Sequence, residues 1–325
     1  MPQLPRLWIV SPVYWDLESY RQLVTEITEK LGSRLRLEFV AIDDTAGIDP
    51  GMETLASAGT ARVITPPFNL GHQRALVFGL RRLAGVVDPD DTVVTMDSDG
   101  EDRPEDVPTL LQELGAAPSP PRIVLARRTS RHVTLAFRLL YSAFVLFFRF
   151  LTGTVVRTGN FAVFRGQALK SLLFHPHFDL CYSASLLSLN LDARLVHCPR
   201  GRRYAGRSKM GYLRLVRHGI SMLLPFLDRV AVRALIICGG ALGVAGGLLG
   251  VALIDAVLSG GQLPLWVVGV ASAIAGLSLT AFLSLLTLFS MYAQSQAAAL
   301  RLLEHRMGEG PQPGLPSPPK CRESA

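Results

Sequence analysis

An apolar run typical of a β-strand, Thr92–Met96, leads directly into an acidic segment. Residues 97–106 hold six carboxylates. If the strand stays extended through Asp99, its two-residue period places the Asp97 and Asp99 carboxylates on one side. Such a pair suits Mg²⁺ or Mn²⁺, with the remaining ligands supplied by substrate phosphates and water. The alternative is a solvated acidic turn ahead of a helix that begins near Pro104.

The segments around this pair alternate between strand and helix patterns. Helical spacing runs over 17–31 and begins again at 71, and strands are expected at 7–10, 35–42, 61–65, 92–96, 123–126, 158–165 and 191–198. This order predicts an α/β fold with a largely parallel sheet. Ligands of such sheets bind at the carboxyl ends of the strands. That edge is expected to hold Pro12, Tyr14, Asp43, Asp44, Asn69, Asp97 and Asp99, although turn formation or helix capping would explain any one of them.

The second half of the chain is basic and then apolar. Residues 133–152 are apolar but carry Arg138 and Arg149, which favours an amphipathic helix at a membrane surface over a span. Long uncharged stretches follow and predict two spanning helices. The expected organisation is a catalytic domain over 1–210, a juxtamembrane helix over 211–232, spans at about 234–256 and 264–292 within 233–300, and a disordered tail over 301–325.

The distribution of basic residues predicts how the spans are oriented. Arg229 and Arg233 precede the first span and Arg301 and Arg306 follow the second, whereas the connecting segment has no Lys or Arg. By the positive-inside rule, the catalytic domain and both termini are expected in the cytoplasm, with the protein in the inner (plasma) membrane. The first apolar run is too short for the core of a signal peptide.

Net charge and cysteine usage narrow the possible partners. The net charge of +7 combines an acidic first part with residues 122–233, which hold 19 basic and 3 acidic side chains. A basic surface beside membrane spans favours anionic lipid headgroups or phosphate ligands. Nucleic acid is not expected, because no nucleic-acid-binding motif appears. The four cysteines lack a metal-ligand or pairing pattern, which fits a reduced cytoplasmic domain.

Several motifs resemble those of the inverting family 2 of nucleotide-sugar glycosyltransferases with the GT-A fold. More narrowly, the chain is similar to the polyprenyl-phosphate glycosyltransferases, over about residue 7 to the second span. The matching positions are Pro12 and Tyr14, the pair Asp43-Asp44, the signature of Asn69, Gly71, Ala75 and Gly79, the Asp-x-Asp of Asp97 and Asp99, the pair Arg138 and Ser142, and the loop of Arg203, Gly206, Ser208 and Lys209.

The resemblance implies a reaction and roles for these residues. A sugar would pass from a nucleotide-diphosphate donor to a polyprenyl phosphate in the bilayer, with inversion. Mg²⁺ or Mn²⁺ would bind at Asp97, Asp99 and Glu101, while Arg203, Ser208 and Lys209 would meet the donor diphosphate. Pro12, Tyr14 and Asp43 would hold the base and ribose, beside Asp44, Asn69 and Gly71. Arg127, Arg138 and Ser142 would hold the lipid phosphate.

Three positions depart from the family pattern. Thr45-Ala46 stands where the family has Gly-Ser, Trp15 stands where it has Asn, and Glu101 stands where it usually has Gln. The first two leave the base and sugar of the donor open. Glu101 adds negative charge beside the expected metal ligands without removing either of them.

Other readings compete with lipid-linked sugar transfer. A processive polysaccharide synthase shares the fold and the Asp-x-Asp, but would need more spans and a Gln-x-x-Arg-Trp motif. A catalytically silent membrane scaffold or a lipid-surface-binding protein are further alternatives. Gly239, Gly243 and Gly247 recur at every fourth position of the first span, which allows close pairing with the second span or with another subunit in a homo-oligomer.

Overall fold

The computed structural model divides the chain into two compact units. The structure describes residues 6–115, 123–128, 135–156, 158–189, 191–205 and 212–308. Within these residues, the first unit comprises 6–143 and 155–225, and the second comprises 144–154 and 226–308. The boundary falls inside one helix, α5 (Leu135–Thr152), which the sequence pattern predicts as amphipathic. Each unit is described by itself.

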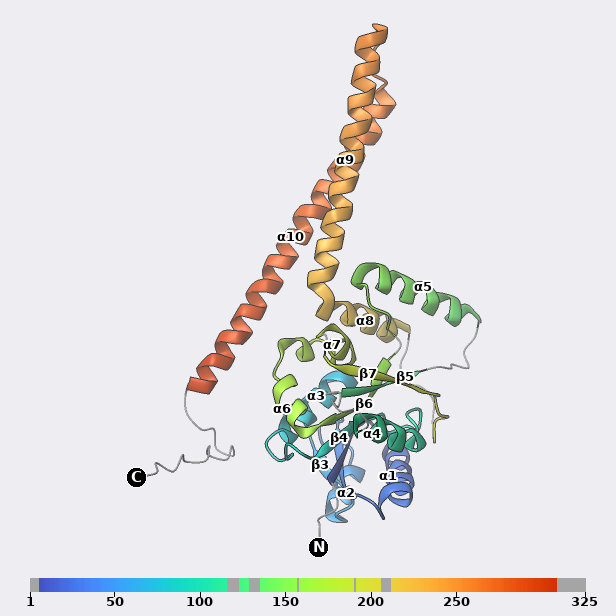
Figure 1. Ribbon diagram of the computed structural model, residues 1–325, viewed down its shortest axis with the longest axis vertical. Helices are drawn as coiled ribbons and strands as arrows, with labels where there is room; N and C mark the ends of the chain where they lie inside the picture. Colours follow the sequence, from blue (N-terminus) through green and yellow to red (C-terminus); the bar gives the residue numbers. More distant parts are fainter. Residues whose placement is uncertain are drawn as a thin grey trace. The chain divides into compact units, whose positions relative to one another are not determined.

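A seven-stranded sheet forms the centre of the first unit (Figure 1). Its order is β3-β2-β1-β4-β6-β5-β7, and only β6 runs antiparallel to its neighbours within the described sheet. The mostly parallel α/β fold expected from the sequence is confirmed. The strands are β1 (Arg6–Val13), β2 (Arg36–Asp43), β3 (Arg62–Ile64), β4 (Thr92–Thr95), β5 (Ile123–Arg128), β6 (Thr158–Arg165) and β7 (Ala193–Cys198).

Helices cover both faces of this sheet and bury two apolar clusters. One cluster joins the sheet to α1 (Leu17–Leu31), α2 (Gly51–Ser57) and α4 (Val107–Gly115). The other joins it to α3 (His72–Leu83), α6 (Gly166–Leu172) and α7 (Tyr182–Ser188). The remaining elements of the unit are α8 (Tyr212–Leu223) and short 3₁₀ turns at Pro104–Asp106, Pro176–Asp179 and Leu224–Phe226, the last of which ends in the second unit.

Helix α3 shows how sequence pattern and packing agree. Its apolar residues recur at helical spacing, and Ala75, Leu76 and Leu80 are fully buried. Gly79 lies on the same face, and a Cβ atom there would overlap the side chain of Ile42 in β2. The Ala75 and Gly79 positions of the signature therefore set how closely α3 packs on the sheet, which in turn fixes the N-terminus of α3 at the carboxyl edge.

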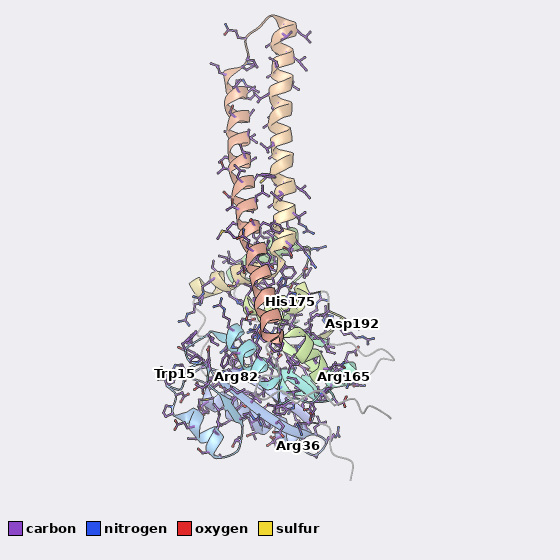
Figure 2. The ribbon with its side chains drawn as sticks, turned by 90° about the vertical axis from the view of Figure 1, so that its left-hand side faces the viewer. Trp15, Arg36, Arg82, Arg165, His175 and Asp192 are labelled. Carbon is purple, nitrogen blue, oxygen red and sulfur yellow. The ribbon has the colours of Figure 1, made fainter. Side chains whose placement is uncertain are left out.

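Two long apolar helices dominate the second unit. Helix α9 (Leu227–Ser259) and helix α10 (Leu265–Gly308) form an antiparallel pair joined by a short turn at Gly260 (Figures 1 and 2). Large apolar side chains such as Leu258, Leu265 and Leu277 are at least 75% exposed. Both helices are long and apolar enough to cross a membrane, as the sequence predicts.

Two details of this unit refine the sequence expectations. Helix α10 continues to Gly308, so residues 301–308 are helical rather than part of a disordered tail; residues 309–325 lie outside the described part of the chain. The glycines of α9 have no atom of the described residues within 4 Å of a Cβ placed on them. Close packing of α9 against α10 therefore does not use the glycine stripe.

Candidate active site

The acidic segment after β4 is a turn rather than an extended strand. Strand β4 ends at Thr95, and Gly100 has a left-handed φ of 85°. The expectation that the strand stays extended through Asp99 is therefore wrong, and the two-residue period does not apply to Asp97 and Asp99. The turn gives the two carboxylates different neighbours, although both stay at the carboxyl edge of the sheet.

Asp97 is surrounded by donors from three other elements. Its Oδ1 lies 2.8 Å from Nε2 of His72 at the start of α3 and accepts from Nδ2 of Asn160 in β6 at 3.1 Å. Its Oδ2 accepts from a guanidinium nitrogen of Arg128 in β5 at 3.3 Å. Arg128 also donates to the buried Asp102 at 2.8 Å, and Asp102 accepts from the backbone N–H of Asp97 at 3.0 Å. Asp97 is thus held in one orientation.

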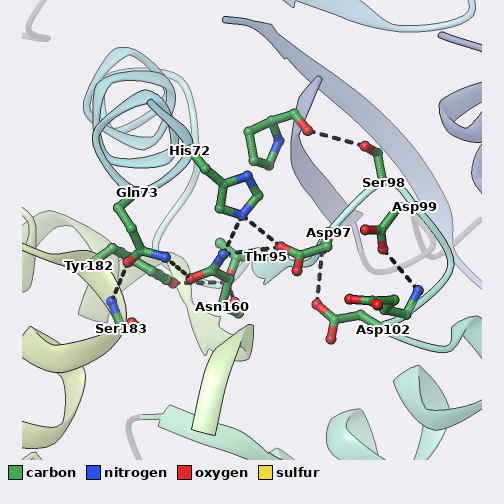
Figure 3. A network of polar contacts seen from close by, with 12 residues as sticks. His72, Gln73, Thr95, Asp97, Ser98, Asp99, Asp102, Asn160, Tyr182 and Ser183 are labelled. Atoms are coloured by element: carbon green, nitrogen blue, oxygen red, sulfur yellow. Dashed lines mark hydrogen bonds and ion pairs between the residues drawn. The ribbon is translucent and has the colours of Figure 1, made fainter. Parts of the chain in front are cut away.

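A second chain of contacts holds Asn160 in place (Figure 3). The side chain of Gln73 donates to Oδ1 of Asn160 at 2.5 Å and accepts from the backbone N–H of Ser183 in α7 at 2.9 Å. The Nδ2 of Asn160 also reaches the imidazole of His72. The hydroxyl of Thr95, the last residue of β4, donates to the backbone carbonyl oxygen of Asn160 at 2.6 Å. The network links β4, β6, α3 and α7 under the acidic turn.

Asp99 and Glu101 face a basic loop instead. The guanidinium of Arg203 lies 2.8 Å from Asp99 and 3.2 Å from Glu101. Arg200 forms a further ion pair with Glu101. Backbone hydrogen bonds tie the loop to the turn, from Gly201 to Glu101 and from Tyr204 to Asp99, each at 2.9 Å. The loop after β7 therefore lies across the acidic turn, as its position after a core strand predicts.

The pKa values of Asp97 and Asp99 are shifted in opposite directions. Burial alone would raise the pKa of Asp97, but His72 and Arg128 hold that pKa well below its usual range. Burial and then the charge of Asp97 raise the pKa of Asp99 to about 6, against the opposing effect of Arg203. Partial burial works to lower the pKa of His72, yet Asp97 and its acidic neighbours raise it overall. The raised pKa of Asp99 thus reflects first its burial and then the nearby charge of Asp97, which Arg203 only partly offsets.

The acid pair at the end of β2, Asp43 and Asp44, hydrogen-bonds to its own turn and to the loop before α3. Asp43 accepts from the backbone N–H groups of Thr45 and Gly47, each at 3.0 Å. Asp44 accepts from the Leu70 N–H at 2.8 Å, and its carbonyl oxygen accepts from Asn69 at 2.6 Å. Gly71 precedes α3 with a left-handed φ of 77°. The Asp43 carboxylate is thus used by its own turn, and Asp44 with Asn69 positions the loop that carries His72.

The end of β1 contributes backbone and aromatic surface. The carbonyl oxygen of Pro12 accepts from the hydroxyl of Ser98 at 3.2 Å, which joins β1 to the acidic turn. Tyr14 is 40% exposed and Trp15 is 49% exposed, and their rings meet edge to face at 6.4 Å. Figure 2 shows Trp15 at the surface of this unit. Exposed aromatic faces at this edge suit a planar base.

The structure leaves some expected site residues apart from the acidic turn. Ser208 and Lys209 lie outside the described residues, as does the side chain of Arg138. Ser142 is exposed on α5. Arg127 makes no ion pair with the acidic turn among the residues the structure describes, whereas the adjacent Arg128 does. Successive strand residues point to opposite faces, and this decides which arginine reaches the site.

Sequence reasoning missed four residues that surround Asp97. His72 and Asp102 are more commonly a packed loop histidine and a capping acid, and Asn160 has no motif to single it out. One signal was available for His72, because it follows Gly71 at the start of the helix after a strand end. For Asn160 and Arg128 the signal is tertiary, since both belong to strands whose order in the sheet the sequence does not give.

The side chains of the acidic turn supply only part of the ligands that a divalent ion needs. Carboxylate oxygens of Asp99 and Glu101 are hard ligands of the kind Mg²⁺ and Mn²⁺ prefer. No group of three or more His, Cys, Asp or Glu side chains that could hold a metal occurs among the described residues. The arrangement therefore suits an ion whose remaining ligands come from a diphosphate and water. The pKa of Asp99 is raised chiefly by burial of its charge and then by Asp97, and a bound cation would stabilise its ionised form.

Comparison with solved structures finds similar chains at low sequence identity. Similar solved structures include mannosyl-3-phosphoglycerate synthase from Rubrobacter xylanophilus, with 17% identity, 70% of this chain and 74% of that chain covered, and a TM-score of 0.49. Glucosyl-3-phosphoglycerate synthase from Mycobacterium tuberculosis with phosphoglyceric acid has 18% identity, coverage of 70% and 80%, and a TM-score of 0.49. The same enzyme with Mn²⁺ and UDP-glucose has 19% identity, coverage of 70% and 79%, and a TM-score of 0.47.

No curated protein matches the chain. The profile of glycosyl transferase family 2 matches residues 8–173, just over half of the 325 residues. The matched range runs from β1 through α6 and includes the acidic turn together with His72, Arg128 and Asn160. The chain therefore belongs to glycosyl transferase family 2 and is a glycosyltransferase with the GT-A fold.

Proposed function

We propose that this glycosyltransferase transfers a sugar from a nucleotide-diphosphate donor to a polyprenyl phosphate in the bilayer. The observation that carries the proposal is the pair of long apolar helices, α9 and α10, attached to a family 2 domain. Helix α5 adds an apolar surface, with Leu146, Phe147 and Phe150 each more than half exposed. A water-soluble acceptor would not require such surfaces.

The reaction needs no strong general base. A phosphate monoester has its second pKa at about 6, so the acceptor oxygen is largely anionic at neutral pH. That oxygen attacks the anomeric carbon, a new carbon–oxygen bond forms to the lipid phosphate, and the bond to the donor diphosphate breaks with inversion. The nucleoside diphosphate leaves with the bonding electrons. The demand on the protein is therefore charge stabilisation and positioning.

The acidic turn and the basic loop would share the charge stabilisation. A divalent ion, when bound, neutralises the departing diphosphate. Asp99 and Glu101 would hold that ion, while Asp97, fixed by His72, Asn160 and Arg128, keeps the turn in place. Arg203 pairs with Asp99 at 2.8 Å. On donor binding its guanidinium would exchange this carboxylate for a donor phosphate, and Ser208 and Lys209, which follow in the sequence, would add further contacts.

The other expected contacts complete the scheme. Tyr14, beside Pro12, would pack against the nucleotide base, while Asp43, Asp44, Asn69 and Gly71 shape the loops around it. Arg138 and Ser142, with Arg127 as a further cation, would hold the lipid phosphate, because arginine can bind two phosphate oxygens at once.

The basic flanks of the helices support a placement in the inner membrane with both termini in the cytoplasm. Since the glycines of α9 do not pack on α10, we further propose that this stripe mediates a homo-oligomer.

A transfer assay tests the proposal. Membranes containing the protein and a polyprenyl phosphate are incubated with a panel of labelled nucleotide sugars and Mg²⁺ or Mn²⁺. Label should pass into a lipid-extractable product with at least one donor, and the Asp99→Asn variant should form at least about a hundredfold less. Label that enters only water-soluble or polymeric products would contradict a lipid phosphate acceptor.

A further inference from the structure

A groove in the second unit has no part in the sugar-transfer scheme. Its volume is about 480 Å³, and it is lined by Leu146, Arg149, Phe150, Arg233, Ile236 and Ile237. The first three residues belong to the last turns of α5, and the others to the early turns of α9. Leu146, Phe150 and Ile236 are each at least 60% exposed, so the apolar lining has no covering in the described structure.

Arg233 is fixed at this groove by the end of α5. Its Nη1 donates to the carbonyl oxygens of Phe150 at 2.5 Å and of Arg149 at 3.3 Å. These carbonyls belong to the last turn of α5, where helical carbonyl oxygens commonly lack partners along the helix. The Arg149 oxygen also accepts from the Gly153 N–H at 2.8 Å, so Arg233 shares that acceptor. Gly153 follows with a left-handed φ of 76°, and a Cβ there would lie 2.7 Å from Nη2 of Arg233. The absence of a side chain at Gly153 leaves room for the guanidinium.

We propose that this groove binds one anionic phospholipid of the bilayer. An acyl chain would lie against Leu146, Phe150, Ile236 and Ile237, and the phosphate would meet Arg149 and Arg233. The charge is complementary, because the lining holds two guanidinium groups and no carboxylate. Charge-assisted hydrogen bonds from arginine to phosphate are among the stronger ones in proteins.

The position of the groove along α9 favours a membrane lipid. Arg233 is the last charged residue before the uncharged stretch 234–254. In a spanning helix this transition lies at the level of the lipid headgroups. A helix of a second copy packed into the groove would take both guanidinium groups out of water without a negative partner, which is costly. A free anion would leave the four apolar side chains uncovered.

The inference rests on the membrane placement proposed above but not on the identity of the acceptor. The test uses the full-length protein in lipid nanodiscs with equal amounts of phosphatidylglycerol and phosphatidylcholine. Lipids that stay bound after release from the nanodisc are identified by native mass spectrometry. Wild-type protein should retain one phosphatidylglycerol in preference to phosphatidylcholine. Arg149→Gln should lower this retention about tenfold, because it removes one charge-assisted contact.

Arg229→Gln is the matched control. Arg229 is a cation one turn before Arg233, but it bonds to Thr154 at 3.3 Å, lies over the Phe226 ring and does not line the groove. This variant should retain phosphatidylglycerol as the wild type does. Arg149→Gln keeps the Arg233 contacts to the α5 carbonyls, so the helix end stays intact.

Three results would overturn the inference. They are equal retention of both lipids by the wild type, equal loss in both variants, and replacement of the phosphatidylglycerol by polyprenyl phosphate added in equal amount. Sugar transfer is measured in the same nanodiscs. Loss of lipid preference with sugar transfer intact would refute the lipid site alone, whereas absent transfer with preserved lipid preference would refute the proposed function alone.

Discussion

The two aspartates of the acidic turn do different work because their neighbours differ. Asp97 accepts from a histidine, an amide and a guanidinium, so its charge is compensated within the protein. The charge of Asp99 is balanced by Arg203, which belongs to a loop and can leave this carboxylate for another anion. Asp97 is therefore suited to position the turn, and Asp99 to meet an incoming ion.

Gly159 is predicted to be required for the position of Arg128. A Cβ atom at residue 159 would lie 2.8 Å from Cζ of Arg128, so Gly159→Ala should displace the guanidinium from Asp97 and Asp102. The loss of these buried charged contacts should cost about 1–3 kcal/mol of unfolding free energy and reduce sugar transfer. Chemical denaturation with a parallel activity assay measures both. Gly85→Ala, where no atom lies within 4 Å, is the control and should match the wild type.

The raised pKa of Asp99 predicts a pH-dependent response to metal. A carboxylate whose pKa in the folded protein lies above its unfolded value destabilises the fold when it is ionised, here above about 6. A divalent ion stabilises the ionised carboxylate but must compete with a proton as the pH falls. The rise in melting temperature on adding Mg²⁺ should therefore be present at about pH 7.5 and largely lost at about pH 5.

The Asp99→Asn variant serves as the control for that measurement. It should show little metal-induced shift at either pH, because the titrating ligand is absent. An equal shift of the wild type at both pH values would mean that Asp99 does not bind the ion.

At the scale of elements, the site is assembled by loops that the sheet brings to one edge. The acidic turn after β4 is hydrogen-bonded to the loop after β7. His72, at the N-terminus of α3, contacts Asp97 in the same turn. The contact between the acidic turn and the loop after β7 depends on a glycine from each side, since a Cβ at Gly100 or Gly201 would overlap the opposite loop. The basic loop is therefore matched in shape to the acidic turn, and its Arg200 and Arg203 face the carboxylates of that turn.

The donor and acceptor phosphates are predicted to use different arginines. Arg203 lies on the loop across the acidic turn, whereas Arg138 belongs to the apolar helix α5. Arg203→Ala should weaken nucleotide-sugar binding more than tenfold, since a charge-assisted contact is worth about 1.5–3 kcal/mol. Arg138→Ala should leave donor affinity nearly unchanged and raise the polyprenyl phosphate concentration needed for transfer. Calorimetry with Mg²⁺ and transfer kinetics report the two effects. Equal weakening of donor binding in both variants would contradict separate phosphate sites, because it would mean that the basic residues act on both substrates together.

Element prediction succeeded where local pattern decides structure. Helix α1 has the predicted bounds, because its apolar residues repeat at helical spacing and are buried. The course of residues 96–100 was not predictable in this way. It depends on His72, Arg128 and Asn160, which arrive from elements distant in sequence. The end of α10 was misjudged for another reason: the charges from Arg301 onward end the apolar run, but they are good helix formers and do not end a helix.

At the scale of the whole molecule, the chain combines a sugar-transfer domain with a helical hairpin suited to a bilayer. The turn of the hairpin at Gly260 has a left-handed φ of 61° and carries no basic residue. Basic residues lie near the other ends of the helices, Arg229 and Arg233 within α9 and Arg301 and Arg306 within α10. This asymmetry sets the expected orientation.

The predicted topology places residues 259–262 outside the cell membrane. A cysteine introduced by Gly260→Cys, with Cys181, Cys198, Cys238 and Cys321 replaced by alanine, should react with an impermeant maleimide in intact cells. A cysteine at Gly85 in the same background is the control and should react only after lysis. Reaction of the Gly260→Cys protein only after lysis would reverse the orientation.

The most direct test of the account is the choice of acceptor by purified protein in nanodiscs. Polyprenyl phosphate, the corresponding unphosphorylated polyprenol and 3-phosphoglycerate are compared with the donor that gives transfer in membranes. The account predicts that only polyprenyl phosphate is glycosylated, to a lipid product whose mass equals the acceptor plus one sugar residue and whose linkage is acid-labile. Transfer to 3-phosphoglycerate, or to polyprenol as readily as to its phosphate, would contradict it.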